Sequence, residues 1–123
     1  MGLEFRKIAI TKVDNIGIIT LNRPEVQNVI SFETFVELDR GLKLLESDEK
    51  VKIILLKANC AISKNNTKIF SAGANLKEYE KKFELIEENP VEFEKTLKQT
   101  KALLSRIEML KKPVIAGVDG LAV

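Results

Sequence analysis

Histidine is absent from the 123-residue sequence, and cysteine occurs once, at Cys60. Without histidine this chain can form neither a histidine-based catalytic triad nor an imidazole metal site, and we expect no metal. A single cysteine cannot form an internal disulfide, so the sequence shows no sign of an oxidising compartment. Acid–base chemistry must therefore rest on carboxylates, lysine, tyrosine or backbone dipoles.

The sequence also lacks an excess of charge of either sign and any long apolar run. Lys and Arg number 20 and Asp and Glu 18, which gives a net charge of +2 spread along the chain. Because no basic stripe could follow a phosphate backbone, we expect no nucleic-acid partner. No run approaches the ~20 apolar residues that span a bilayer, and the first 12 residues contain no apolar stretch. We expect no membrane association and a cytoplasmic protein, or a matrix protein after processing.

What the sequence does contain, 45% hydrophobic and 31% charged residues, is typical of one soluble globular domain. Apolar residues alternating from Ile8, and the β-branched run at residues 16–21, predict a β-hairpin. Ser31 is a candidate N-cap for an amphipathic helix. The apolar run at residues 51–56 predicts a strand buried on both faces, which completes a parallel βαβ unit. The predicted helix has apolar residues at Phe35, Leu38, Leu42 and Leu45, and solvent-facing residues at Glu37, Arg40, Lys43 and Glu46.

Two capping signatures predict further helices. Before them, residues 58–68 contain a polar, turn-forming run at residues 63–67 and predict an exposed loop. Asn75 and Glu78 have the spacing of a capping box, and we expect Glu78 to act as the capping partner of Asn75 rather than as a general base. Asn89 followed by Pro90 predicts the start of a third, long helix. The apolar stripe of that helix is expected to consist of Phe93, Leu97, Leu103, Leu104, Ile107 and Leu110.

The end of the chain predicts a helix stop and one more strand. Lys111 and Lys112 are expected to neutralise the negative end of the third helix before Pro113 stops it. Residues 114–118 then predict another buried strand, which turns at residues 119–120.

Three segments together resemble the enoyl-CoA hydratase/isomerase (crotonase) family. They are Ile-Thr-Leu-Asn-Arg-Pro at residues 19–24 with Asn28 four residues later, Phe-Ser-Ala-Gly-Ala-Asn-Leu-Lys-Glu at 70–78, and Lys-Pro-Val-Ile-Ala-Gly-Val-Asp-Gly at 112–120. Each alone would be weak, but their order and separations make the resemblance specific. It implies an α/β fold of the crotonase type (ClpP/crotonase), a spiral of strand-strand-helix repeats. Residues 1–123 would then be a single crotonase-like domain that is incomplete at its carboxy-terminal end.

The resemblance also implies where ligands bind. Members of the family bind acyl-CoA thioesters and stabilise an enolate-like oxyanion with two backbone amides, of which Ala74 is expected to supply the first. Small residues at 72–74 let a ligand approach the backbone, and the helix that follows points its positive end at the oxygen. Coenzyme A enters as part of the substrate and not as a permanently bound cofactor. The residues expected to contact it are Arg23, Glu25, Val26 and Gln27 after the second strand, and Ala72, Ala74, Asn75, Leu76 and Lys77 around the first donor.

Two positions depart from the pattern of the family. Many members have a basic residue where Glu25 stands, which leaves Arg23 or a carboxy-terminal residue as candidates for the contact to the phosphates. Many also have aspartate where Asn75 stands, and asparagine caps a helix about as well.

The resemblance implies an enzyme that hydrates or isomerises an enoyl-CoA and assembles as a homotrimer or homohexamer. The second oxyanion donor and the catalytic glutamates are expected beyond residue 123, so this chain alone should have little or no turnover. An alternative function is a non-catalytic acyl-CoA-binding or assembly module with the same fold. A nucleotide-binding α/β domain is disfavoured because no Gly-rich phosphate loop follows any predicted strand.

Overall fold

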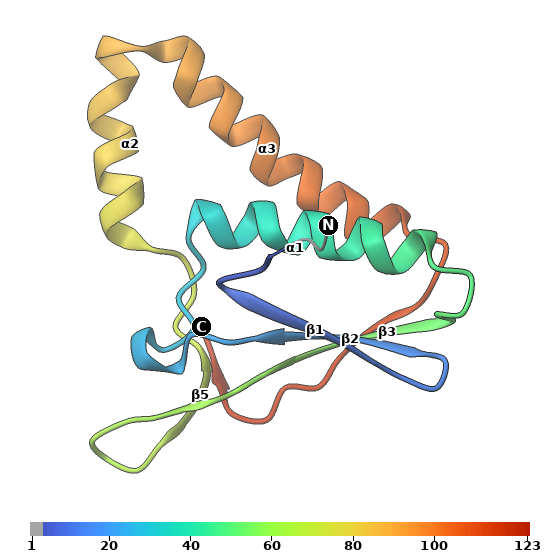
Figure 1. Ribbon diagram of the computed structural model, residues 1–123. Helices are drawn as coiled ribbons and strands as arrows, with labels where there is room; N and C mark the ends of the chain where they lie inside the picture. Colours follow the sequence, from blue (N-terminus) through green and yellow to red (C-terminus); the bar gives the residue numbers. More distant parts are fainter. Residues whose placement is uncertain (1–3) are drawn as a thin grey trace.

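The structure is a computed structural model that describes residues 4–123 apart from the side chain of Leu85. Its strands form two small sheets, and the three α-helices lie on one side of them (Figure 1). The elements, in chain order, are β1 (Ile8–Val13), β2 (Ile16–Leu21), the 3-10 helix η1 (Pro24–Val26), α1 (Phe32–Ser47), β3 (Ile53–Ala58), β4 (Ala61–Ile62), β5 (Lys68–Ser71), α2 (Leu76–Glu88), α3 (Pro90–Met109), β6 (Val114–Ala116) and β7 (Leu121–Ala122).

The larger sheet has the strand order β1-β2-β3-β6. β1 and β2 form the predicted antiparallel hairpin, which turns at Asp14 with a φ of 53°. β2 and β3 are parallel and are joined through α1, which confirms the predicted βαβ unit. β6 adds to β3, again in parallel, so that Val114 lies opposite Ile54.

The smaller sheet has the order β4-β5-β7 and contains a strand that the sequence did not predict. Residues 58–68 were expected to form an exposed loop, but Ala61 in β4 is 8% exposed and pairs with Ile69 in β5. The turn between the two strands includes Asn66, which has a φ of 61°. A two-residue strand such as β4 has no periodicity of its own that a sequence pattern could reveal.

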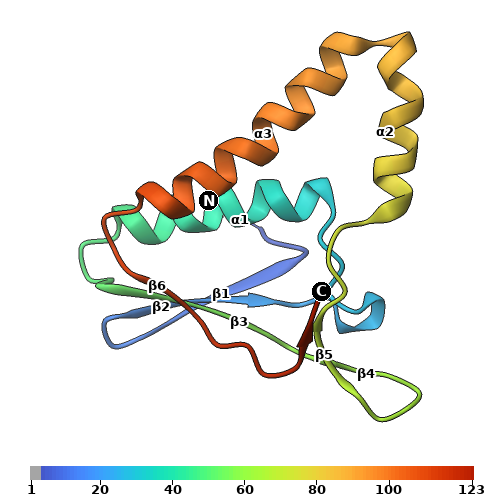
Figure 2. The same cartoon turned by 180° about the vertical axis from the view of Figure 1, so that it is seen from behind.

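The helices cover only one face of the larger sheet, as the view from behind also shows (Figure 2). Ile54 is fully buried on the helix side, whereas its neighbour Ile53 on the opposite side is 36% exposed. In β6, Ile115 is 52% exposed. The prediction that these two strands are buried on both faces is therefore wrong for residues 4–123. None of the helices in this range combines the length and apolar character that a membrane span requires.

The core lies between this sheet and helices α1 and α3. Its buried members are Ile8, Ile19, Leu21, Leu42, Leu45, Val51, Ile54, Phe70 and Leu103. The predicted stripe of the third helix is correct for Leu103 in α3 and for Leu110 just after it, which packs against the core, but Leu97 and Leu104 are 49% and 59% exposed. The amino-terminal part of α3 extends past α1 and meets α2 at the turn between the two helices, so only the carboxy-terminal half of α3 lies over the sheet (Figure 1).

Glu37 was predicted on the solvent side of α1 but is 4% exposed. Its carboxylate accepts hydrogen bonds from the backbone amides of Arg6 and Lys7, which lead into β1. Glu37 therefore supplies the acceptor for two backbone amides just before β1, while the Lys7 carbonyl accepts from the Asn22 amide just after β2.

Lys112 also acts on a helix other than the predicted one. Its Nζ donates to the carbonyl oxygens of Leu45 and Asp48, each at 2.7 Å, at the end of α1. α3 already ends at Met109. The ammonium therefore neutralises the negative end of α1 and not that of its own helix.

Replacing Lys112 by methionine keeps most of the aliphatic stem and removes both charge-assisted hydrogen bonds. We expect Lys112→Met to lower the free energy of unfolding by about 1–3 kcal/mol, measured by urea denaturation. The exposed neighbour provides a matched control, and Lys111→Met should change it by less than about 0.5 kcal/mol. Equal losses for the two variants would contradict a specific role for Lys112.

Candidate functional site

The segment 27–30 pairs with the turn at residues 71–75 and joins the two sheets. The Ala72 amide donates to the Gln27 carbonyl at 2.9 Å. The Ile30 amide donates to the Gly73 carbonyl at 2.7 Å, and the Ile30 carbonyl accepts from the Asn75 amide at 3.1 Å. The loop after β2 and the turn after β5, which the resemblance assigned to one ligand, therefore lie side by side.

This pairing leaves one amide of the turn unused. Ile30 bonds to the residues on either side of Ala74, so the Ala74 N–H points away from the bridge. The Gly73 amide is used as well, since it donates to Ser71 Oγ at 3.1 Å. Across residues 4–123 the Ala74 amide donates to no backbone or side-chain acceptor, and Ala74 is exposed. The turn thus presents a single free N–H just before the amino end of α2, where the helix dipole favours negative charge.

Gly73 makes this turn possible for two independent reasons. Its φ of +87° lies in the region that favours glycine, and a Cβ placed on it would lie 2.7 Å from the Val123 carbonyl oxygen. Val123 in turn donates its amide to the Ser71 carbonyl at 3.1 Å, next to the β5–β7 pairing. The backbone on both sides of Gly73 is therefore fixed before any ligand arrives.

The loop after β2 is held by Asn28, which is 2% exposed. Its Oδ1 accepts from the Arg23 amide at 2.7 Å, and its Nδ2 donates to the carbonyls of Asn59 and Phe70 at 2.8 and 3.0 Å. Asn28 belongs to the first motif of the resemblance, but no contact was predicted for it. Two of its three partners, Asn59 and Phe70, are 31 and 42 residues away, so no local pattern could reveal these contacts.

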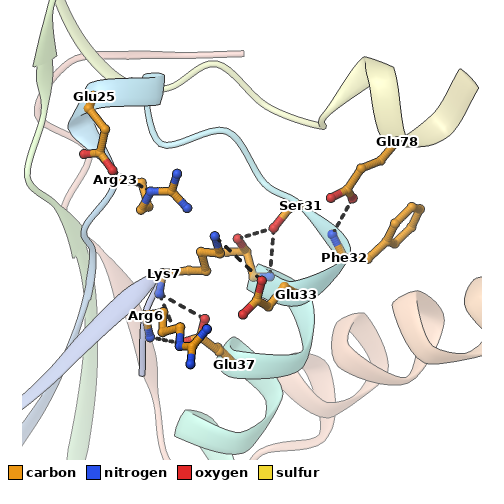
Figure 3. A network of polar contacts seen from close by, with 10 residues as sticks. Arg6, Lys7, Arg23, Glu25, Ser31, Phe32, Glu33, Glu37 and Glu78 are labelled. Atoms are coloured by element: carbon orange, nitrogen blue, oxygen red, sulfur yellow. Dashed lines mark hydrogen bonds and ion pairs between the residues drawn. The ribbon is translucent and has the colours of Figure 1, made fainter. Parts of the chain in front are cut away.

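The charges of this loop are paired with each other. Arg23 Nε lies 2.5 Å from Glu25 Oε1, and Figure 3 shows the two side chains together above the amino end of α1. The pKa of Glu25 is lowered, first by a hydrogen bond from its own backbone amide and then by Arg23. Lys7 and Arg23 also line a cavity of about 180 Å³ beside Asn75. Glu25 therefore stays ionised at neutral pH and competes with any anion for Arg23.

The predicted capping box at Asn75 is correct in one half and wrong in the other. Asn75 Oδ1 accepts from the Glu78 amide at 3.3 Å, as expected. The Glu78 carboxylate does not return to Asn75 but accepts from the Phe32 amide at 2.8 Å, at the start of α1 (Figure 3). The Asn75 amide is already bonded to Ile30, so the reciprocal partner of the box was not available. Glu78 instead ties the amino ends of two helices together.

The remaining predicted contacts lie along the surface of the same region. Val26 is 40% and Leu76 79% exposed, and Lys77 is exposed too. Leu76 and Phe83 line an open cavity of about 710 Å³ along one face of α2. No group of three or more His, Cys, Asp or Glu side chains within the described residues is placed to hold a metal ion.

Comparison with known proteins gives a consistent match. The enoyl-CoA hydratase/isomerase family model matches residues 11–123. A short-chain-enoyl-CoA hydratase from Clostridium acetobutylicum is 29% identical over 120 residues, which cover 98% of this chain and 41% of that protein. A trans-2-decenoyl-acyl-carrier-protein isomerase from Streptococcus mutans is 27% identical over 122 residues, covering 96% and 41%.

Among solved structures, the enoyl-CoA hydratase subunit I of Geobacillus kaustophilus matches with a TM-score of 0.77 and 32% identity. The match covers 98% of this chain and 41% of that one. The chain therefore spans about two fifths of the length of the relatives that it matches.

The need for glycine at residue 73, for its positive φ and for the lack of space for a Cβ, can be tested by replacing two glycines with alanine. Gly73→Ala should lower the free energy of unfolding by more than about 1–2 kcal/mol, because strain at positive φ adds to the contact with Val123. It should also speed hydrogen exchange at the Val123 amide. Gly117→Ala is the matched control, since its nearest atom would be Leu55 Cδ1 at 3.6 Å, an ordinary contact. If both variants unfold at the same denaturant concentration, the conformation of the turn does not depend on Gly73.

Proposed function

Because the chain belongs to the enoyl-CoA hydratase/isomerase family, we propose that it binds an acyl-CoA thioester with the Ala74 amide donating to the thioester oxygen. Its α/β architecture is that of the crotonase-type structures that it matches. The observation that carries the proposal is the unpaired Ala74 N–H in a turn whose neighbouring amides are all bonded. A preorganised donor of this kind contributes roughly 3–4 kcal/mol to stabilising an oxyanion.

The coenzyme A part is proposed to lie along the two segments that the Ile30 pairing brings together. These are the loop with Arg23, Glu25, Val26 and Gln27, and the turn and helix start with Ala72, Asn75, Leu76 and Lys77. Two features support this placement. The loop and turn are directly hydrogen-bonded, and both segments are accessible from solvent. Arg23 is proposed as the phosphate contact, in competition with Glu25.

The reaction to which this site contributes is proposed to be hydration or isomerisation of an enoyl-CoA. Relatives named as a hydratase and as an isomerase both match, so the family does not choose between the two. We propose, from the resemblance, that the second oxyanion donor and the catalytic glutamates come after residue 123. We therefore propose that the chain alone binds the thioester without turning it over, and that the functional assembly is a homotrimer or homohexamer.

The proposal is tested by titrating the ¹⁵N-labelled 123-residue chain with butyryl-CoA and, separately, with S-butyl-CoA. The two ligands have the same carbon count, but the thioether has no carbonyl oxygen. A hydrogen bond to the thioester oxygen should move the Ala74 amide proton downfield with butyryl-CoA only. Shifts in the loop at residues 23–27 should be common to both ligands.

If the Ala74 amide signal moves equally with both ligands, or with neither, the proposed oxyanion role of Ala74 is wrong. Crotonyl-CoA hydration is then followed with the same chain, and turnover above background would overturn the placement of the acid and base. The alternative function, a binding or assembly module, predicts the loop shifts without any Ala74 response.

The pairing of Arg23 with Glu25 predicts a gain of affinity from a single change. Glu25→Gln removes a carboxylate that repels phosphate and releases the guanidinium. We expect coenzyme A to bind roughly two- to fivefold more tightly, measured by calorimetry at low salt. Glu108→Gln makes the same change in net charge near the far end of α3 and should leave the affinity unchanged (Figure 1). An equal gain from both variants would mean that only net charge matters.

A further inference from the structure

The carboxamide of Asn28 is buried, and its oxygen and both of its N–H groups are hydrogen-bonded. Each of the three partners belongs to a different segment. The oxygen takes the amide of Arg23 in the loop after β2. The two N–H groups go to the carbonyl of Asn59, just after β3, and to that of Phe70 in β5. One side chain therefore connects the proposed coenzyme A loop to the strand that carries the Ala74 turn.

The backbone at this point is held in a conformation that most residues avoid. Gln27 and Asn28 have successive φ values of 57° and 50°. Two left-handed residues in a row cost of order 1–2 kcal/mol each, unless local bonds offset the strain. Here Asn28 closes a ring with Arg23, since its amide donates to the Arg23 carbonyl while its Oδ1 accepts from the Arg23 amide.

This reversal points the carbonyls of residues 27 and 28 at the turn. The Gln27 carbonyl accepts from the Ala72 amide at 2.9 Å, and the Asn28 carbonyl accepts from Ser71 Oγ at 2.8 Å. Ser71 Oγ in turn receives the Gly73 amide. The conformation of Asn28 thus sets the acceptors that occupy the amides before Ala74.

We propose that Asn28 is a positioning residue, whose carboxamide fixes the distance and orientation between the loop at residues 23–27 and the Ala74 amide. This inference rests on the proposed function, because it concerns how the two parts of that site are held in register for one ligand. A thioester whose nucleotide end is bound at the loop meets the Ala74 N–H only if the two segments keep their relative position. Loss of the Asn28 carboxamide should therefore affect the polarisation of the thioester carbonyl more than the affinity for coenzyme A.

Two variants separate this role from a contribution to stability alone. Asn28→Gly removes the carboxamide but suits the left-handed backbone. Asn28→Asp keeps an acceptor for the Arg23 amide but loses both donors, and it sets a carboxylate against the carbonyls of Asn59 and Phe70. Asn66→Gly is the matched control, because Asn66 is also left-handed, with a φ of 61°, but lies in the turn between β4 and β5.

The first measurement is made without ligand. In the unmodified chain the Asn28 side-chain N–H signals should exchange slowly with solvent, and free exchange of these protons would overturn the inference. In Asn28→Gly and Asn28→Asp the amides of Ala72 and Asn75 should exchange about tenfold faster, as expected for the loss of roughly one hydrogen bond. The amide of Ile10, in the hairpin, should change far less. Uniform acceleration throughout the chain would show a purely structural role.

The second measurement uses butyryl-CoA labelled with ¹³C at the thioester carbonyl. Binding to the unmodified chain should lower the carbonyl stretching frequency in the infrared. In Asn28→Gly this frequency should return toward the value of the free ligand. The affinity of this variant for coenzyme A should fall by less than about threefold. An unchanged frequency in a folded Asn28 variant overturns the inference and leaves the proposed function intact. If the carbonyl frequency does not shift on binding to the unmodified chain, the proposed function is wrong. The exchange data then still decide whether Asn28 couples the loop to the turn. If both variants fail to fold, the inference is decided by how fast the Asn28 side-chain N–H protons exchange with solvent in the unmodified chain.

Discussion

The bridge between Ile30 and the residues flanking Ala74 is the interaction on which the rest of the site depends. It joins the loop that leaves one sheet to the turn that leaves the other, and both bonds are short enough to be well formed. Because a parallel bridge uses the amides of alternate residues, the same geometry that pairs the turn leaves the Ala74 amide without a partner. The pairing with Ile30 thus both holds the turn in place and leaves the Ala74 amide available as a donor.

Helix α1 is stabilised at both ends by charges from distant parts of the chain. Glu78 accepts from the first amide of the helix, and Lys112 donates to carbonyls at its end. Each charge has the sign that the helix dipole favours at that end. In its middle, Glu37 takes the amides that lead into β1. The βαβ unit is therefore tied to α2, to β1 and to the segment before β6 by polar contacts as well as by the core.

Much of the fold could be predicted from the sequence, because its signals are local. Ser31 and Asn89 cap helices with their own side chains, and the hairpin and the βαβ unit follow from short apolar runs. The predictions for Glu37, Glu78 and Lys112 went wrong for a common reason. A charged side chain in or beside a helix can satisfy backbone groups of that helix or of another segment, and tertiary packing selects the partner. For the site, the motif identified the turn around Ala74, whereas the contacts of Asn28 join segments up to 42 residues apart and had no local signature.

The position of β6 and β7 in the two sheets has a consequence for the order of folding during synthesis. β1, β2, α1 and β3 are contiguous in sequence and can assemble as soon as they leave the ribosome. β6 pairs with the edge of β3 and β7 with the edge of β5, so one short stretch of chain adds a strand to both sheets. A nascent chain stalled before residue 114 therefore leaves both of these strand edges open at once, and open edges can pair with another chain.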